Sequence, residues 1–224
     1  MSDLPRPDAV LFDLDGTLVD SVQRRIEAWQ AALAELGVTV SAQAAGDQIG
    51  RDGAAVALEL AASGGVHLDQ DAAAALDSRA GELFGELNAV AVPAPGVPDV
   101  VSALDRLGIP WAIATSSRPA QVASSVAALG LSRPPRIVDG SAVENAKPAP
   151  DLLLLGARQL AVEPGRCWYV GDAVWDMQAA VAAGMVAVAV TAGSASDEPA
   201  LRRAGAADVL PTLAHLADRL TPAE

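Results

Sequence analysis

The chain has 224 residues, 51% of them apolar, and carries a formal net charge of −13 at pH 7. This length and composition predict a globular protein with one large domain, or with a domain and a smaller insert, and the lack of basic clusters argues against nucleic acid as a partner. No apolar stretch approaches the roughly 20 residues of a membrane helix and the N-terminus lacks the features of a signal peptide, so we expect a cytoplasmic protein with no membrane partner.

The first predicted strand ends in acidic residues. The run "VLFDLDGT", residues 10–17, begins with apolar residues that indicate a buried strand, and Asp13 and Asp15 follow them. An ionised carboxylate is costly to bury unless it is paired or bound to a metal. Residues two apart at a strand end also share a face, which brings the two charges together. These acids therefore require a cationic partner.

The residues after this strand predict an all-helical segment. Apolar residues recur at helical spacings in three stretches, at about residues 22–36, 52–62 and 69–87. Closely spaced prolines, the first of them Pro93, then end the helical pattern. The predicted division is a core domain of residues 1–20 and 91–224 and an inserted helical domain of residues 21–90.

Beyond the prolines, short apolar runs alternate with helical stretches. This alternation is typical of βαβ units, and predicts an α/β fold with a parallel sheet covered by helices on both faces, the doubly wound arrangement. The predicted strands lie at residues 111–115, 136–139, 167–171, 186–190 and 207–210, and the predicted helices lie near residues 98–107, 119–129, 149–160 and 173–183. The pattern does not distinguish a monomer from a homodimer.

The residues that follow each strand are the candidates for a site, because ligands of parallel sheets bind beyond the carboxyl ends of the strands. Four carboxylates gathered there would repel one another by several kcal/mol, so a cation is expected among them, and oxygen ligands of this kind suit Mg²⁺. Lys147 and the Thr115 hydroxyl could hold the oxygens of a phosphate. The candidates are Asp13, Asp15, Thr115, Ser116, Ser117, Lys147, Asp172 and Asp176.

Each candidate also has a purely structural interpretation. Asp172 is suited to cap the helix that follows it, and Asp176 would favour the positive end of that helix. Thr115 at a strand end could be an ordinary turn hydroxyl. Lys147 precedes a helix start, where a cation opposes the helix dipole, so its placement favours a bound anion, whereas the structural alternative is a solvated lysine that tolerates this position. From the residues taken singly, these alternatives stay open.

Four segments taken together resemble a known family. The runs "DLDGT", "AIATSS", "NAKPAPD" and "VGDAVWD", in this order, are similar to the four motifs of the haloacid dehalogenase-like hydrolase superfamily. The helical insert after the first motif resembles the C1 cap of that superfamily. The resemblance spans nearly the whole chain and implies a Rossmann-like core with a helical cap that closes over the substrate.

The resemblance also implies a role for each matched residue. Asp13 corresponds to a nucleophile that forms an aspartyl-phosphate, and Asp15 to a general acid that later acts as a base, in the Mg²⁺-dependent hydrolysis of a small phosphorylated metabolite. The implied metal ligands are the Asp13 carboxylate, the Asp15 backbone carbonyl and the Asp172 carboxylate, with Asp176 in support. The implied phosphate-binding residues are Thr115, Ser116 and Lys147, and Arg51 in the cap segment is a candidate for contact with the substrate.

Other branches of the superfamily fit less well. Asp15 argues against the metal-free dehalogenases, and the cap segment contains no lysine for the Schiff base of phosphonatase-like members. β-Phosphoglucomutase-like members carry a histidine in the first cap helix where this chain has Arg25, which makes a sugar phosphomutase the less favoured alternative. A binding or regulatory module without catalysis is the other alternative. The sequence does not assign a role to Trp175.

Overall fold

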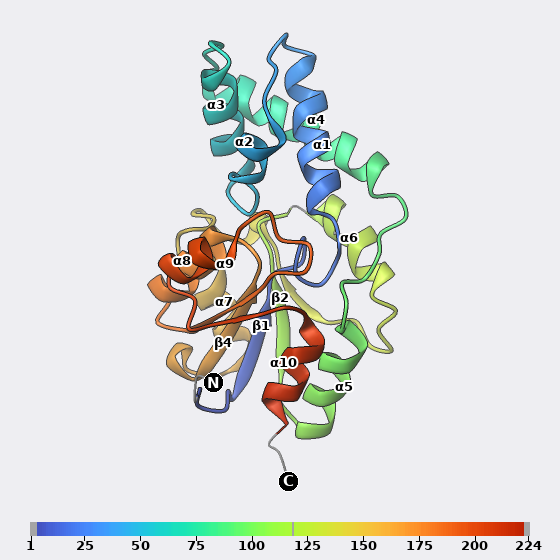
Figure 1. Cartoon of the computed structure of the whole chain (residues 1–224), viewed down its shortest axis with the longest axis vertical. Coiled ribbons are helices and arrows are strands. Elements are labelled where there is room, and N and C mark those ends of the chain that lie inside the picture. The colour runs from blue at the N-terminus through green and yellow to red at the C-terminus, as the bar shows by residue number, and fades with distance from the viewer. Residues whose placement is uncertain (1–3, 118, 222–224) are drawn as a thin grey trace.

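A computed structural model describes residues 4–117 and 119–221, and its centre is a parallel sheet of six strands (Figure 1). The strand order is β3-β2-β1-β4-β5-β6, so β1 lies between the strands that carry the later motifs. The strands are β1 (Ala9–Phe12), β2 (Trp111–Ala114), β3 (Arg136–Val138), β4 (Cys167–Gly171), β5 (Val186–Val190) and β6 (Asp208–Leu210). All five of the predicted runs and the opening run form strands of this one sheet.

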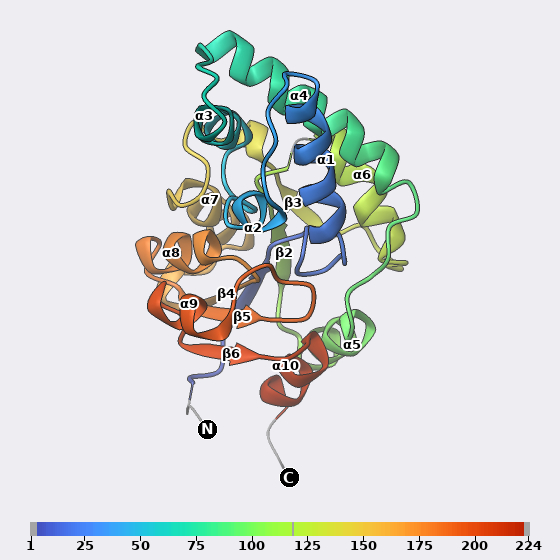
Figure 2. The ribbon, with the colours of Figure 1, turned by 45° about the horizontal axis from the view of Figure 1, so that its top comes forward.

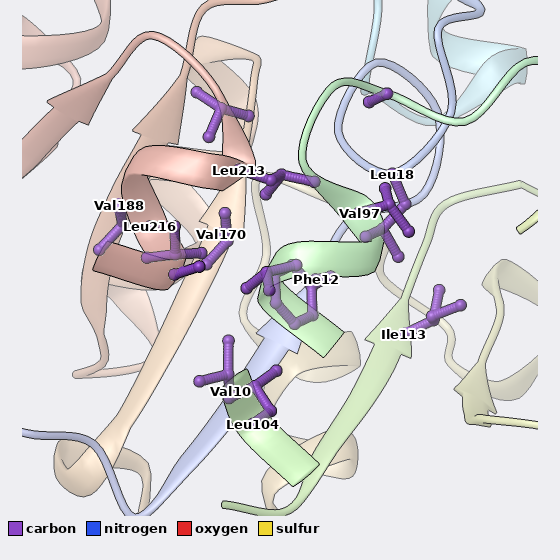
Figure 3. Close-up of a cluster of buried hydrophobic side chains, with 14 of the residues drawn as sticks. Val10, Phe12, Leu18, Val97, Leu104, Ile113, Val170, Val188, Leu213 and Leu216 are labelled. Carbon is purple, nitrogen blue, oxygen red and sulfur yellow. The ribbon is translucent and has the colours of Figure 1, made fainter. Parts of the chain in front are cut away.

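Helices cover both faces of the sheet, because successive side chains of a strand point to opposite sides. One face carries the larger side chains, among them Val10 and Phe12, and packs against α5 (Val97–Leu107), α6 (Pro119–Ala128) and α10 (Leu213–Leu220). Figure 3 shows this cluster, with Leu104 and Leu216 directed at the sheet from α5 and α10. Its buried apolar side chains hold these helices in place through the hydrophobic effect.

The opposite face is built from smaller residues. The strands present small residues there, among them Ala9, Ala112 and Ala187, and the face packs against α7 (Asp151–Leu160), α8 (Val174–Ala182) and α9 (Glu198–Arg203). Gly156 of α7 sits so close to Leu11 that a Cβ there would lie 3.0 Å from a Leu11 methyl. Small residues therefore let these helices approach the sheet, and the chain has the expected doubly wound, Rossmann-like α/β architecture.

Four helices lie beyond the carboxyl ends of the strands (Figures 1 and 2). They are α1 (Val22–Ala34), α2 (Ala42–Gly46), α3 (Gly53–Ser63) and α4 (Gln70–Leu87). They share a buried cluster that includes Ile26, Trp29 and Leu60, so the apolar stripe of the first of these helices is packing, as its spacing predicts. Residues 21–90 are thus helical, whereas their boundary as a separate domain stays a prediction.

Three helices were not predicted from the sequence: α2, α9 and α10. They have five, six and eight residues, too few for a periodic pattern to emerge from an alanine-rich chain. Within the described residues, no helix has the combination of length and apolar character that crossing a membrane would require.

Candidate active site

The loop after β1 places the first two acids of the site. Asp13 and Asp15 are both nearly buried, and the loop turns at Gly16, where φ is +90°. A Cβ on Gly16 would lie 2.4 Å from Oδ2 of Asp172, so glycine is needed both for the backbone conformation and for the approach of that carboxylate. The amide of Gly16 donates to the carbonyl of Val19 at 2.8 Å and closes the turn.

Lys147 is the cation at the centre of this site. Its ammonium donates to Oδ1 of Asp13 at 2.6 Å and to Oδ1 of Asp176 at 2.7 Å, and it also lies 3.1 Å from the hydroxyl of Tyr169. The side chain is 1% exposed. A charge buried so completely is tolerated only when it is paired, and here two carboxylates pair it.

The buried charges shift one another's protonation. Burial raises the pKa of Asp13 from 3.8 to about 7, although the neighbouring Lys147 acts to lower it. Burial and the charge of Asp176 also raise the pKa of Asp172 well above its usual value. Burial alone would lower the pKa of Lys147, but Asp13 and Asp176 outweigh it and raise that pKa well above 10.5. If all three carboxyl groups were ionised, the cluster would carry more negative charge than one lysine balances.

Asp176 has its hydrogen-bonding capacity filled by the protein. Its Oδ1 accepts from Lys147 and from the Tyr169 hydroxyl, and its Oδ2 accepts from the backbone amides of Asp172 and Ala173, at 3.1 and 3.0 Å. It thus holds the start of α8 and orients Lys147, and the expectation that it favours the positive end of this helix agrees with these contacts.

Asp172 does not cap the helix that follows it. The N-cap of α8 is Ala173, and the carboxylate of Asp172 turns instead toward the loop after β1, where the Thr17 hydroxyl donates to its Oδ1 at 3.0 Å. Among the described residues, carboxylate oxygens of Asp13, Asp172 and Asp176 all lie within 4.8 Å of one another. Because Asp176 is already occupied, the first two are the carboxylates best placed for a cation.

Asp15 is held by three donors. The Ser21 hydroxyl donates to Oδ1 at 3.0 Å, and Oδ2 accepts from Arg25 at 2.8 Å and from the Ser117 hydroxyl at 2.6 Å. Ser117 follows β2, whereas Ser21 is the N-cap of α1 and Arg25 lies near the start of that helix. The side chain of Asp15 is therefore fixed jointly by the sheet and by the first helix of residues 21–90.

The residues predicted to bind phosphate differ in their contacts. Thr115 is buried, and its oxygen accepts the amide of Ser117 at 3.2 Å, which leaves its hydroxyl hydrogen as a donor. The Ser116 hydroxyl donates to the carbonyl of Gly50 at 3.3 Å, across to the helical segment. The lysine Lys147 faces Asp13. All three line one cavity with Asp13 and Asp15.

A loop of residues 47–52 covers this cavity from the helical side. Arg51 lines the cavity and pairs with Glu59 at 2.5 Å, and its guanidinium lies 4.6 Å from the ring centroid of Trp175. The indole N–H of Trp175 donates to the carbonyl of Asp47 at 3.0 Å. Trp175 of α8 thus fastens this loop to the core. The cavity has a volume of about 60 Å³.

Sequence reasoning missed several residues of the site. Arg25 and Ser21 lie one helical turn apart, and their position just after the "DLDGT" loop was the available signal that they face the strand end. The Tyr169 hydroxyl was hidden in the apolar run "CWYVG", although its place two residues before Gly171 puts it near the end of β4. Ser117 was among the candidates that follow a strand, but its place there predicted no contact with Asp15.

Comparison with known proteins shows the family of the chain. The model of the haloacid dehalogenase-like hydrolase family matches residues 7–184. Phosphoglycolate phosphatase of Pseudomonas putida is 34% identical over 191 residues, which cover 84% of this chain and 70% of that protein. N-acetylmuramic acid 6-phosphate phosphatase of Pseudomonas aeruginosa is 33% identical over 192 residues, covering 84% of this chain and 83% of that protein. A hydrolase of Pseudomonas syringae has a crystal structure that superposes with a TM-score of 0.89 at 30% identity, over 95% of this chain and 97% of that one.

The chain therefore belongs to the haloacid dehalogenase-like hydrolase family. Within it, the chain is a phosphatase, a phosphoric monoester hydrolase. The resemblance of the four motifs and the predicted fold class are both confirmed by these matches.

Proposed function

We propose that the chain hydrolyses a small phosphorylated metabolite through an aspartyl-phosphate on Asp13, with Mg²⁺ as cofactor. The observation that carries this proposal is the placement of Lys147 2.6 Å from Oδ1 of Asp13 at the wall of a cavity that Asp15 also lines. A nucleophile, an acid or base and a fixed cation then face the same small volume. This combination suits the transfer of a phosphoryl group.

The donor set fits a magnesium ion. The carboxylates of Asp13 and Asp172 are oxygen donors within 4.8 Å of each other, Gly16 leaves space at the second of them, and burial raises the pKa of both, which a bound cation would relieve. We propose that these carboxylates and the Asp15 backbone carbonyl hold the ion, and that Asp176 supports them. When bound, Mg²⁺ would neutralise charge on the phosphoryl oxygens.

The roles of the side chains follow from their chemistry. Asp13 would attack phosphorus as a carboxylate, a form that Lys147 favours by its charge. Asp15 would donate a proton to the departing oxygen and later accept one from the attacking water. Lys147 and the Thr115 hydroxyl would bind the phosphoryl oxygens. We propose that Ser116, which lines the same cavity, binds them as well.

The substrate is proposed to be small. The cavity of about 60 Å³ is much smaller than the roughly 300–1,000 Å³ of an ordinary ligand site, and we propose that the loop with Arg51 moves when a metabolite enters. We propose residues 21–90 as the cap that makes this movement over a core of residues 1–20 and 91–224. The guanidinium of Arg51 would then contact the part of the substrate remote from phosphorus. The relatives act on phosphoglycolate or on a sugar phosphate by name, which supports a substrate of this size.

Phosphate release from a panel of phosphorylated metabolites tests the proposal. We expect release by the native protein with Mg²⁺, none with excess chelator, and none by Asp13→Asn. Asp105→Asn, an exposed acid on α5, is the matched control and should retain activity. Trapping with acid should recover phosphate bound to the native chain and none on Asp13→Asn. Release that survives in Asp13→Asn would contradict the aspartyl-phosphate.

Two alternatives give different results in the same assay. A sugar phosphomutase would isomerise a sugar phosphate without net release of phosphate. A binding module would neither release phosphate nor isomerise, although it would still bind the metabolite. The ion pair between Asp15 and Arg25, at the position where mutase-like members carry histidine, favours hydrolysis over the first alternative. The set of acids and Lys147, retained and in contact, argues against the second.

A further inference from the structure

We propose that Arg25 is a positioning residue for Asp15, and that it holds the Asp15 carboxylate in the orientation from which it acts on the substrate. This inference rests on the proposed function, because it concerns the acid and base step of that reaction. It follows from the donors that surround the two oxygens of the Asp15 carboxylate.

The oxygen Oδ2 faces donors that form a closed triangle. Arg25 donates to Oδ2 at 2.8 Å and to the Ser117 oxygen at 3.1 Å, and the Ser117 hydroxyl donates to Oδ2 at 2.6 Å. A guanidinium stays protonated and has no acceptor, so it always presents hydrogen to Oδ2. Because the Ser117 oxygen accepts a hydrogen bond from Arg25, the hydroxyl hydrogen of Ser117 is free to point at Oδ2. Arg25 and Ser117 together therefore fix the orientation of the carboxylate.

The oxygen Oδ1 is held from the other side. The Ser21 hydroxyl donates to Oδ1 at 3.0 Å, and the carbonyl of Val19 lies 3.4 Å from the same hydroxyl. Arg25 and Ser117 belong to the lining of the cavity, whereas Ser21 lies outside it. The contacts that orient the carboxylate on the cavity side are therefore those that Arg25 and Ser117 make with Oδ2.

The position of Arg25 depends on the helices that hold it. Its guanidinium carbon lies 3.5 Å from the centroid of the Phe84 ring in α4, and its side chain is 13% exposed. Arg25 thus packs between α1 and α4 while it contacts the loops after β1 and β2. The orientation of the Asp15 carboxylate therefore depends on the packing of these helices on the core.

The proton then moves as follows. As the bond from Asp13 to phosphorus forms and the bond from phosphorus to the leaving oxygen breaks, the proton of the Asp15 carboxyl group passes to the leaving oxygen. Water then attacks phosphorus, the bond to Asp13 breaks, and a proton of the water passes to the Asp15 carboxylate. Atoms and charges balance, and Arg25 keeps its protons throughout.

A comparison of leaving groups tests this assignment. p-Nitrophenolate departs without a proton, whereas the alkoxide from 2-hydroxyethyl phosphate needs one, and neither substrate has a second anionic group that Arg25 could bind. We expect Arg25→Gln to lower kcat/KM about 30-fold or more for 2-hydroxyethyl phosphate and less than about threefold for p-nitrophenyl phosphate. Arg25→Lys should restore part of the loss. The matched control is Arg24→Gln on the same helix, which should leave both values near those of the native protein.

The positioning role of Arg25 and the proposed function fail on different results. Equal losses on both substrates, or none on either, would overturn the positioning role while leaving the proposed function intact. If Arg25→Gln does not fold, Ser117→Ala removes one donor to Oδ2 without a change of charge, and it should give the same unequal losses. No Mg²⁺-dependent release from any phosphomonoester by the native protein would instead refute the proposed function, and the Arg25 assignment with it.

Discussion

The ammonium of Lys147 lies 2.6 Å from Oδ1 of Asp13, and both side chains are buried. They are 134 residues apart in the chain, so the contact exists only because α7 and β1 pack together. Lys147 is also the single lysine of the sequence. The pair of Lys147 and Asp13 therefore affects both the chemistry of the proposed nucleophile and the stability of the fold.

Replacement of this lysine should damage both. Lys147→Met keeps much of the side-chain volume but leaves Asp13 and Asp176 without their cation. We expect phosphatase activity to fall at least about 100-fold, and the free energy of unfolding of the metal-free protein to fall by about 3–5 kcal/mol at pH 7.5. Urea denaturation and phosphate release measure the two effects. Unchanged stability would show that the buried pair makes no net contribution.

The pKa of Asp13 predicts how the metal-free protein responds to pH. Because burial raises this pKa from 3.8 to about 7, the protonated carboxyl stabilises the folded state, and that contribution is lost as the pH rises from about 4 to about 7. The free energy of unfolding in EDTA should therefore decrease from pH 5 to pH 7, by up to about 1.4 kcal/mol per pH unit. Mg²⁺ should stabilise the protein more at pH 7.5 than at pH 5.

The comparison variant for this experiment is Asp13→Asn. Its amide cannot ionise, so its stability in EDTA should decrease less steeply over the same interval, with the remaining slope due to Asp172. Asp105→Asn should keep the slope of the native protein. Parallel curves for the native protein and Asp13→Asn would contradict the raised pKa.

Asp176 and Asp172 should differ in their effect on metal binding. Asp176 gives its oxygens to Lys147, Tyr169 and two backbone amides, so we expect Asp176→Asn to weaken Mg²⁺ binding about 10- to 100-fold through the loss of support. Asp172→Asn should abolish measurable binding. Titration calorimetry checks both. If the two variants lose binding equally, Asp176 is itself a ligand.

The parts of this site that the sequence predicted are those fixed by strand ends. Asp13, Asp15 and Asp172 follow buried apolar runs directly, so the topology of a parallel sheet suffices to bring them to one edge. The same runs predicted the sheet. Lys147 does not directly follow a strand, and its contact with the site was predicted from its motif and its charge instead.

The missed residues depend on packing that no local pattern encodes. Arg25 meets Ser117 across 92 residues, and the meeting requires the orientation of α1 on the core, which the helical spacing leaves undetermined. Tyr169 is one residue of an apolar run, and only the alternation of β4 turns its hydroxyl toward Lys147. The contact of Trp175 with Asp47 likewise joins two segments whose distance is set by the tertiary fold.

Trp175 provides a last prediction, about closure of the cavity. Its N–H bonds the Asp47 carbonyl and its ring lies under Arg51, so it holds the loop of residues 47–52 against the core. Trp175→Phe removes the hydrogen bond and keeps the ring, which should raise KM about threefold, whereas Trp175→Ala removes both and should raise KM about tenfold or more. In each case kcat should change less than about threefold, because neither contact reaches Asp13 or Asp15.

The control is Trp111→Phe in β2, whose ring packs edge-on against Phe12 and lines no part of the cavity. It should leave KM unchanged while lowering thermal stability. A fall in kcat at constant KM for Trp175→Ala would mean that Trp175 acts on the chemical step. An unchanged KM in both Trp175 variants would mean that the loop contributes nothing to substrate binding. A smaller rise in KM for Trp175→Phe than for Trp175→Ala is the result expected when Trp175 holds the loop against the core through both its hydrogen bond and its ring.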